Sequence, residues 1–415
     1  MNKKKLLLKN TFMLYLLTFS SYFFSFISVP YQTRVLGPDL YGRLGFAAAF
    51  VAYFQLLIDF GFLLSATEDI SSHREDKHYV SKTLTSVVCI KIAFSALSMA
   101  VVLGLCSFVP KFSEDPMLYI LYIVMTIVNA MLPDFVYRGL EQMTAITVRT
   151  VLIRLFFTVM IFVFLREASD YYIVPILNII GGIGALAGVY YHLSKKMDIH
   201  LIKPDFKDVV RCFKRSSTFF YSRIATTVYG STNTFILNLI CGDGITGLYT
   251  SADKLVSTAK SAASPISDSL YPYMMKNKDF KTVRKVLSLI MPVIFLGCTV
   301  VFIFAEPLCV WLFGAEFAGT GNVLRALMPS VLFILPNYIL GFPTLGAMGL
   351  SKYANYSIIA GTIVHIVGLT IIALCGWFSV ISVAIMTSIT EFVILLYRAF
   401  MIWKNRKVFS ASAAE

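Results

Sequence analysis

The sequence predicts an all-α polytopic membrane protein, with twelve transmembrane helices in two six-helix lobes around a central cavity. The first observation is composition. Of the 415 residues, 57% are hydrophobic and only 14% are charged, against about 25% charged residues in a typical soluble domain. The second is that the hydrophobic residues gather in stretches of about 20, the length that crosses a bilayer as a helix. The third is that the connections are short, so no large soluble domain is expected.

The predicted spans are separated by polar or charged connections. The longest connection, residues 194–215, is strongly basic. The first apolar stretch is longer than the core of a signal peptide and lacks a convincing cleavage site, so we interpret it as the first span. The predicted spans are residues 11–34, 42–66, 80–108, 117–137, 145–165, 170–193, 216–240, 246–273, 286–305, 321–348, 353–375 and 377–402.

The distribution of Lys and Arg predicts that both termini lie in the cytoplasm. With the N-terminus inside, 26 of these residues fall in cytoplasmic segments, 4 in external segments and 6 within spans. Cytoplasmic loops of membrane proteins carry such an excess. The same bias explains the net charge of +13, so nucleic-acid binding is not expected.

The sequence carries no motif that indicates an enzyme, a cofactor site or a metal site. The seven cysteines lie too far apart for a zinc site or a CxxC redox motif. No Walker A loop for ATP is present, and neither is an HExxH or GxSxG motif. We therefore expect no enzymatic activity and no cofactor.

The two halves of the chain resemble each other at a constant offset of 205 residues. Gly37, Gly42 and Ala47, around the first turn, correspond to residues of the same type 205 positions later, around the seventh turn. This offset agrees with half the chain length. Because both halves begin in the cytoplasm, the predicted repeats are parallel and related by an axis along the membrane normal. The predicted domains are an N-terminal lobe, residues 1–205, and a C-terminal lobe, residues 206–415.

Polar residues at helical spacing predict a hydrated cavity between the lobes. Ser and Thr alone also fit ordinary helix–helix packing, which stays an alternative. Charged residues in the same stripes favour the cavity, because a charge at the centre of a bilayer is costly and usually faces water. The predicted polar lining comprises Ser21, Ser25, Ser28, Gln32, Thr226, Asn233, Ser257 and Ser264.

Cations within the spans predict a site for an anionic headgroup. Arg offers a two-pronged donor and Lys a point charge for phosphate oxygens. The alternative for each cation is a local salt bridge, which for Lys260 would involve Asp253 or Asp268. The candidate headgroup residues are Arg223, Lys260, Lys91, Arg154, Lys254 and Arg325.

Three acids within the spans are candidates for coupling transport to protons or Na⁺: Asp59, Glu391 and Asp253. The alternatives are a buried ion pair and a protonated acid. His365, in the middle of a span, is expected to form a hydrogen bond to a neighbouring helix.

One predicted span contains three prolines spaced by seven residues, Pro329, Pro336 and Pro343. Proline removes a backbone hydrogen bond and kinks a helix. This span is a candidate gating helix, and a static kink is the alternative.

Four stretches of the chain resemble the Wzx-type O-antigen and polysaccharide flippases. They are VPYQTRVLGPDLYGRLGFA (29–47), DFGFLLSATEDIS (59–71), FVYRGLEQM (135–143) and GLYTSADKL (247–255). That family is part of the multidrug/oligosaccharidyl-lipid/polysaccharide exporter superfamily, whose twelve-span, two-lobe transporters work by alternating access. One departure is Glu68, which stands where the resemblance leads us to expect a basic residue.

The resemblance implies a flippase of the bacterial inner membrane. Its substrate would be an undecaprenyl pyrophosphate-linked oligosaccharide, moved from the cytoplasmic to the periplasmic leaflet. Partners would be the lipid bilayer and the polysaccharide polymerase and chain-length regulator of the pathway. Coupling to protons or Na⁺ is left open.

Three alternatives also stay open. A cation-coupled multidrug antiporter of the same superfamily would be expected to have a more acidic or apolar cavity. A flippase for lipid-linked peptidoglycan precursors would be expected to have fourteen spans. A membrane glycosyltransferase or polymerase of the same pathway would need a larger external loop.

Overall fold

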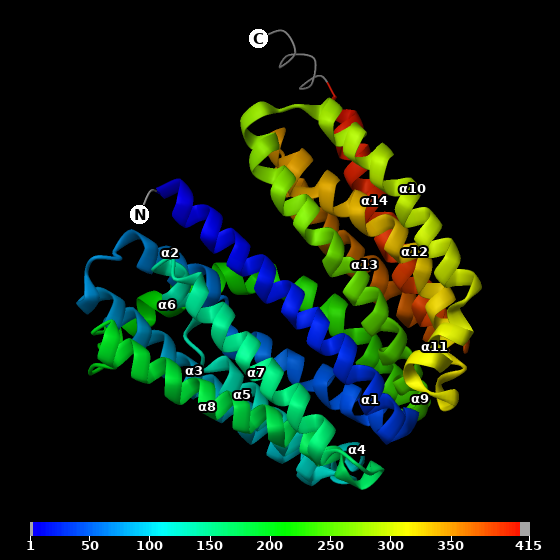
Figure 1. The fold of residues 1–415 in the computed structure, drawn as a ribbon, viewed down its shortest axis with the longest axis horizontal. Helices are drawn as coiled ribbons and strands as arrows, with labels where there is room; N and C mark the ends of the chain where they lie inside the picture. Colours follow the sequence, from blue (N-terminus) through cyan, green and yellow to red (C-terminus); the bar gives the residue numbers. More distant parts are fainter. Residues whose placement is uncertain (1–2, 407–415) are drawn as a thin grey trace. The chain divides into compact units, whose positions relative to one another are not determined.

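The computed structural model describes residues 3–406, without the side chains of residues 3–11, 14, 222, 225, 226 and 272. All regular structure in this range is helical (Figure 1). A bilayer leaves no water to satisfy free backbone groups, so a chain of this composition must pair them within helices.

The first half of the chain forms eight helices and one short 3₁₀ turn. They are α1 (Lys3–Asp59), α2 (Phe62–Ser72), α3 (Lys77–Phe108), α4 (Pro110–Ser113), α5 (Pro116–Ala130), α6 (Asp134–Gly139), α7 (Met143–Phe164), η1 (Ala168–Tyr172) and α8 (Ile173–Lys196).

The second half begins with one very long helix, α9. Its elements are α9 (Phe206–Asn277), α10 (Phe280–Ile303), α11 (Ala305–Phe313), the turn η2 (Ala315–Phe317), α12 (Thr320–Ile339), the π-helical segment η3 (Leu340–Gly346), α13 (Ser351–Leu374) and α14 (Val380–Lys404).

Two helices are far longer than a membrane is thick, and both break at a glycine. At 1.5 Å per residue, the 57 residues of α1 would extend about 85 Å, against about 30 Å of hydrocarbon. Gly37 in α1 has φ 69° and ψ 175°, and Gly242 in α9 has φ 82° and ψ −178°. Glycine adopts such positive φ values without steric cost, so each long helix turns there.

Within residues 3–406, nine helical segments are long and apolar enough to cross a membrane. One of them, Tyr15–Ser72, covers 58 residues, and α9 is not among the nine. The prediction of a multi-pass helical membrane protein is therefore confirmed.

The helices extend beyond the predicted spans because polar caps add turns outside the apolar stretches. Asp76 accepts a hydrogen bond from the amide of Tyr79 at the start of α3. Asp279 accepts from the amides of Lys281 and Thr282 at the start of α10. The Thr282 hydroxyl also donates to Asp279, and this hydrogen bond holds the pKa of that carboxyl below its usual value.

The predicted connection 194–215 is shorter in the structure, which leaves only residues 197–205 outside α8 and α9. Residues 206–215 form the amphipathic start of α9, where Cys212 is buried and Lys214 is exposed. A hydropathy pattern finds the part of a helix that crosses the bilayer, so it misses a helical turn with a charged face.

The contacts divide the chain into two compact units. Unit 1 comprises residues 1–36 and 46–227, and unit 2 comprises residues 37–45 and 228–415. Each unit has an apolar core of its own. In unit 1 this core includes Phe62, Leu84 and Val136, and in unit 2 it includes Met274 and Leu335.

Candidate functional site

Unit 1 contains an acid–lysine pair in which the lysine is buried and the acid is half-buried. Nζ of Lys91, in α3, lies 3.3 Å from Oδ1 of Asp59 and donates to the carbonyl of Ala130 at 2.5 Å. Asp59 is the last residue of α1, where the helix dipole disfavours a negative charge. Lys91, only 5% exposed, offsets that charge. Both residues therefore have partners within unit 1.

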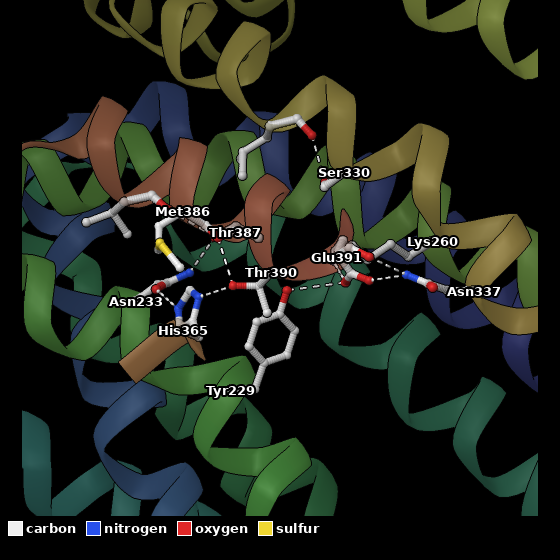
Figure 2. A network of polar contacts seen from close by, with 12 residues as sticks. Tyr229, Asn233, Lys260, Ser330, Asn337, His365, Met386, Thr387, Thr390 and Glu391 are labelled. Atoms are coloured by element: carbon white, nitrogen blue, oxygen red, sulfur yellow. Dashed lines mark hydrogen bonds and ion pairs between the residues drawn. The ribbon is translucent and has the colours of Figure 1, made fainter. Parts of the chain in front are cut away.

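Unit 2 contains a second pair, at the centre of a larger polar network (Figure 2). Glu391, in α14, is 9% exposed. Its Oε1 accepts from Lys260 and from the hydroxyl of Tyr229, both at 3.2 Å. Its Oε2 accepts from Nδ2 of Asn337 at 2.9 Å. Three donors from α9 and α12 thus surround one carboxylate, as a buried charge requires.

The network continues around His365 in α13, as Figure 2 shows. The imidazole lies 2.9 Å from the hydroxyl of Thr390 and 2.7 Å from Oδ1 of Asn233. Nδ2 of Asn233 donates to Tyr249 and Thr387, both at 2.8 Å. The expected hydrogen bond between His365 and a neighbouring helix is present.

Lys260 pairs with Glu391, and not with Asp253 or Asp268, the two candidate acids of its own helix. Asp253 and Asp268 lie seven and eight residues away along α9, which is about 10–12 Å along the helix axis. Side chains of one helix meet at spacings of three or four residues, so neither acid is the partner of Lys260 in the structure. Asp253 is half-buried and interacts electrostatically with Lys260.

The six candidate cations divide equally between the units. Lys91, Arg154 and Arg223 belong to unit 1, and the other three belong to unit 2. Arg154 donates to the carbonyl of Ser21 at 3.3 Å. Arg223 is half-buried and Lys254 is exposed.

Arg325, in α12, forms its hydrogen bonds with a residue of α10 and with a residue of its own helix. It donates to the carbonyl of Phe302 at 3.1 Å and to Oδ1 of Asn322 at 2.7 Å. Within unit 2, the structure therefore brings Lys260, and not Arg325, into contact with Glu391.

The residues of the predicted polar lining differ in burial and in hydrogen-bond partners. Ser28 and Gln32 are buried, Ser25 is half-buried, and the side chain of Thr226 lies outside the described residues. Three hydroxyls bond within their own helix: Ser21 to the Leu17 carbonyl, Ser257 to the Lys254 carbonyl, and Ser264 to Asp268. Among the lining residues whose side chains are described, only Asn233 joins the network around His365.

The proline-rich span has the irregular backbone that its sequence predicts. Pro329 and Pro336 lie within α12, and Pro343 lies in η3. Proline has no N–H to bond the carbonyl four residues earlier, which for Pro343 is the carbonyl of Ile339. The hydroxyl of Thr344 donates a hydrogen bond to this carbonyl instead, at 2.8 Å. The gating role of this span stays a prediction.

Arg398 is a functional candidate that sequence reasoning missed. Its charge counts among the cytoplasmic residues in the topology prediction, but the structure leaves it only 6% exposed. It donates to the Ser357 hydroxyl at 2.8 Å and to the carbonyl of Asn337, next to the break in the backbone at Gly341. The reason is local: beside the irregular backbone the carbonyl of Asn337, which also accepts from the amide of Leu340, takes a second hydrogen bond from this long cation.

Tyr229 and Asn337 were also missed. Asn337 is a single amide in an apolar stretch, and its one signal in the sequence is its position directly after Pro336, because a proline kink exposes backbone groups that an amide can bond. Tyr229 lies three residues after Thr226 and four before Asn233, a spacing that places it on the same face of the helix as the predicted polar stripe.

The chain matches the family described as "Polysaccharide biosynthesis protein" over residues 7–278. The chain belongs to this family. It is 25% identical over 366 residues to a protein of Shigella dysenteriae named "Putative O-antigen transporter", which covers 86% of this chain and 91% of that protein. A protein of Escherichia coli (strain K12) with the same name is 25% identical over 295 residues, 69% of each chain. The resemblance to polysaccharide flippases is confirmed, and the chain groups with transporters, not enzymes.

Two solved structures have the same fold. An inward-facing multidrug resistance MATE family transporter of the MOP superfamily superposes with a TM-score of 0.69 at 14% identity, over 92% of this chain and 96% of that one. The lipid II flippase MurJ, in an inward closed conformation, superposes with a TM-score of 0.68 at 15% identity, over 98% and 91%. At these identities the likeness shows the fold alone.

Proposed function

We propose that the protein is a flippase for an undecaprenyl pyrophosphate-linked oligosaccharide, such as an O-antigen repeat unit. It moves this substrate from the cytoplasmic to the periplasmic leaflet of the bacterial inner membrane by alternating access. The observation that carries the proposal is the family match, with two relatives named as O-antigen transporters. The fold shared with MATE transporters and MurJ supports it. The polysaccharide polymerase and the chain-length regulator are the proposed protein partners.

The proposal includes twelve spans with both termini in the cytoplasm. Dividing α1 at Gly37 and α9 at Gly242 leaves twelve pieces of at least 20 residues, an even number. They are residues 3–36, residues 38–72, Lys77–Phe108, Pro116–Gly139, Met143–Phe164, Ala168–Lys196, residues 206–241, residues 243–277, Phe280–Ile303, Thr320–Gly346, Ser351–Leu374 and Val380–Lys404.

A reciprocal contact supports the proposed parallel repeat of residues 1–205 and 206–415. A Cβ on Gly42 would lie 1.8 Å from the carbonyl oxygen of Asp243, and a Cβ on Gly247 would lie 2.0 Å from that of Pro38. Both glycines and both carbonyls are related by the 205-residue offset. Gly42 contacts the residue equivalent to Pro38, and Gly247 contacts Pro38 itself. Such a reciprocal contact is characteristic of two-fold symmetry.

We propose that Lys260 and Arg223 bind the phosphates of the substrate, with Lys91, Arg154, Lys254 and Arg325 as further cations. The pairing of Lys260 with Glu391 suggests how binding is coupled to an ion. A proton or Na⁺ on Glu391 would weaken its attraction for Lys260 and leave the ammonium group for a phosphate. Asp59 and Asp253 are the other candidate acids for coupling.

Reconstituted vesicles test the proposed function directly. Purified protein is placed in vesicles with an undecaprenyl pyrophosphate-linked oligosaccharide, and the fraction reaching the opposite leaflet is measured by cleavage with an added glycosidase. We expect transport of this substrate and none of a cationic drug. Export of the drug without movement of the lipid would favour the multidrug antiporter, and sugar transfer onto the lipid would favour the enzyme.

The proposed topology makes a separate prediction for reporter fusions. A cytoplasmic signal after Asp243 would contradict both the twelve spans and the parallel repeat, because this site lies at the break of α9. Alkaline phosphatase and green fluorescent protein fusions distinguish the two compartments. We expect periplasmic signals near Asp39, Ser113, Asp243 and Ala315, and cytoplasmic signals near Glu75, Asp198 and Asp279.

A further inference from the structure

Unit 1 carries a large apolar groove that no part of the proposed transport path uses. It lies between α7 and α8 and has a volume of about 960 Å³. Three glycines of α8, Gly181, Gly184 and Gly188, lie along it. Leu152 and Ile180, among its apolar lining residues, are more than half exposed, so the groove opens at the surface of the unit.

The groove runs along the helices for more than the depth of one leaflet. On α7 it extends from Thr144 to Phe156, and on α8 from Ile180 to His192. In each range the first and last residues are twelve positions apart, which is about 18 Å at 1.5 Å per residue. One leaflet contributes about 15 Å of hydrocarbon, half of the whole core. The groove therefore accommodates a chain that reaches past the bilayer midplane.

Polarity changes along the groove. Glu141, which pairs with Arg74, lies with Gln142, Arg149 and His192 at the end where α7 begins and α8 ends, and the lining residues from Leu152 to Phe156 are apolar. These polar side chains already have partners: Arg149 forms two hydrogen bonds with Asp134, and His192 bonds Tyr137. The groove itself therefore selects an apolar chain and has polar groups at one end only.

The glycines leave open notches in the wall of the groove. Small residues at spacings of three and four usually let two helices approach closely. At Gly184 and Gly188, however, an added Cβ would meet nothing within 4 Å. Protein side chains therefore do not fill these notches, and methyl branches of a bound chain fit them.

We propose that this groove binds the polyprenyl chain of the lipid-linked substrate, with the phosphate end toward Arg149. The proposal rests on the proposed function, which supplies a substrate with such a chain. A polyprenyl chain carries a methyl branch on every unit and is longer than one leaflet is deep. The unbranched acyl chain of a phospholipid ends near the midplane and leaves the deep end of the groove unfilled.

Photolabelling of the purified full-length protein tests this assignment. The probe is undecaprenyl monophosphate with a diazirine on one of the isoprene units nearest the phosphate, which the groove is long enough to hold, and labelled peptides are mapped by mass spectrometry. We expect labels within α7 and α8 that are displaced by unlabelled undecaprenyl monophosphate and not by phosphatidylglycerol. Equal displacement by phosphatidylglycerol, or labels confined to other helices, would overturn the proposal.

Filling the notches provides a second measurement. Gly184→Leu and Gly188→Leu should each weaken binding of undecaprenyl monophosphate by about tenfold, the loss expected for about two buried methylenes. Gly104→Leu is the control, because Gly104 lies in α3, away from the groove, and an added Cβ there also meets nothing. Unchanged affinity for the long chain in both variants would contradict the proposal.

Transport separates this proposal from the proposed function. Labelling in the groove without any flipping of lipid-linked oligosaccharide would count against the flippase and keep the chain-binding groove. Normal flipping by Gly184→Leu vesicles, together with labels outside α7 and α8, would count against the groove alone.

Discussion

Lys260→Ala is expected to abolish surface polysaccharide in a strain that lacks its own flippase. In the proposed mechanism Lys260 binds a substrate phosphate, and a hydrogen bond to a charged group is worth about 1.5–3 kcal/mol. Transport in vesicles should therefore fall at least tenfold. Lys260→Arg should keep part of the activity, because the charge remains while its geometry changes. Lys254→Ala, on the same helix and exposed, provides a comparison at a further candidate cation.

The single variant alone does not distinguish binding from stability. Removing one partner of a buried ion pair leaves an uncompensated charge, at a cost of about 3–5 kcal/mol. Lys260→Ala combined with Glu391→Gln removes both charges. We expect this double variant to restore the amount of protein in the membrane without restoring transport. Transport by the double variant at the rate of the unchanged protein would show that the pair serves only stability.

Glu391→Gln by itself tests the coupling role. Glutamine keeps the size of the side chain and accepts from Lys260, but it does not take up and release a proton near neutral pH. We expect the variant to bind undecaprenyl pyrophosphate and to lose transport driven by a pH gradient. Gradient-driven transport at the normal rate would assign coupling to Asp59 or Asp253, or remove it from the mechanism.

The fold followed closely from the sequence because the bilayer restricts what an apolar chain can do. A stretch of about 20 apolar residues without water must form a helix, so most helices were predicted within a few residues. Two errors lie within apolar stretches, because the helices of the predicted spans 42–66 and 117–137 end at Asp59 and Ala130 and a new helix begins a few residues later. The other errors lie outside the apolar stretches. Residues 206–215 are helical through their amphipathic pattern, and Arg398 lies inside the bundle because a neighbouring backbone is broken.

The candidate site was harder to predict, since periodicity gives the face of a helix and not its neighbour. The stripe in α9 identified Lys260, but its partner Glu391 is 131 positions away in another helix. Nothing in either stretch of sequence indicates the other. Tyr229 and Asn337 complete the same carboxylate site through helix packing that only the three-dimensional structure shows. The 205-residue offset did indicate one spatial contact. It relates Gly42 to Gly247 and Pro38 to Asp243, and these four residues meet in the structure.

Gly247→Ala is expected to destabilise the protein by more than about 3 kcal/mol, beyond the usual cost of overpacking. The added Cβ would lie 2.0 Å from the carbonyl oxygen of Pro38, and backbone cannot rotate away as a side chain can. Gly42→Ala should cost a similar amount, because its Cβ would meet Asp243 in the equivalent way. The amount of folded protein in the membrane and its thermal unfolding in detergent measure both effects.

Gly230→Ala, in the same long helix, is the matched control. Its Cβ would meet nothing within 4 Å, and alanine is favoured over glycine in a helix by about 1 kcal/mol, so this variant should unfold at the same temperature or a higher one. A stable Gly247→Ala protein would mean that the two helices do not cross as closely as the structure has them. A large loss for Gly247→Ala with none for Gly42→Ala would remove the two-fold symmetry of the contact, and with it the structural support for the parallel repeat.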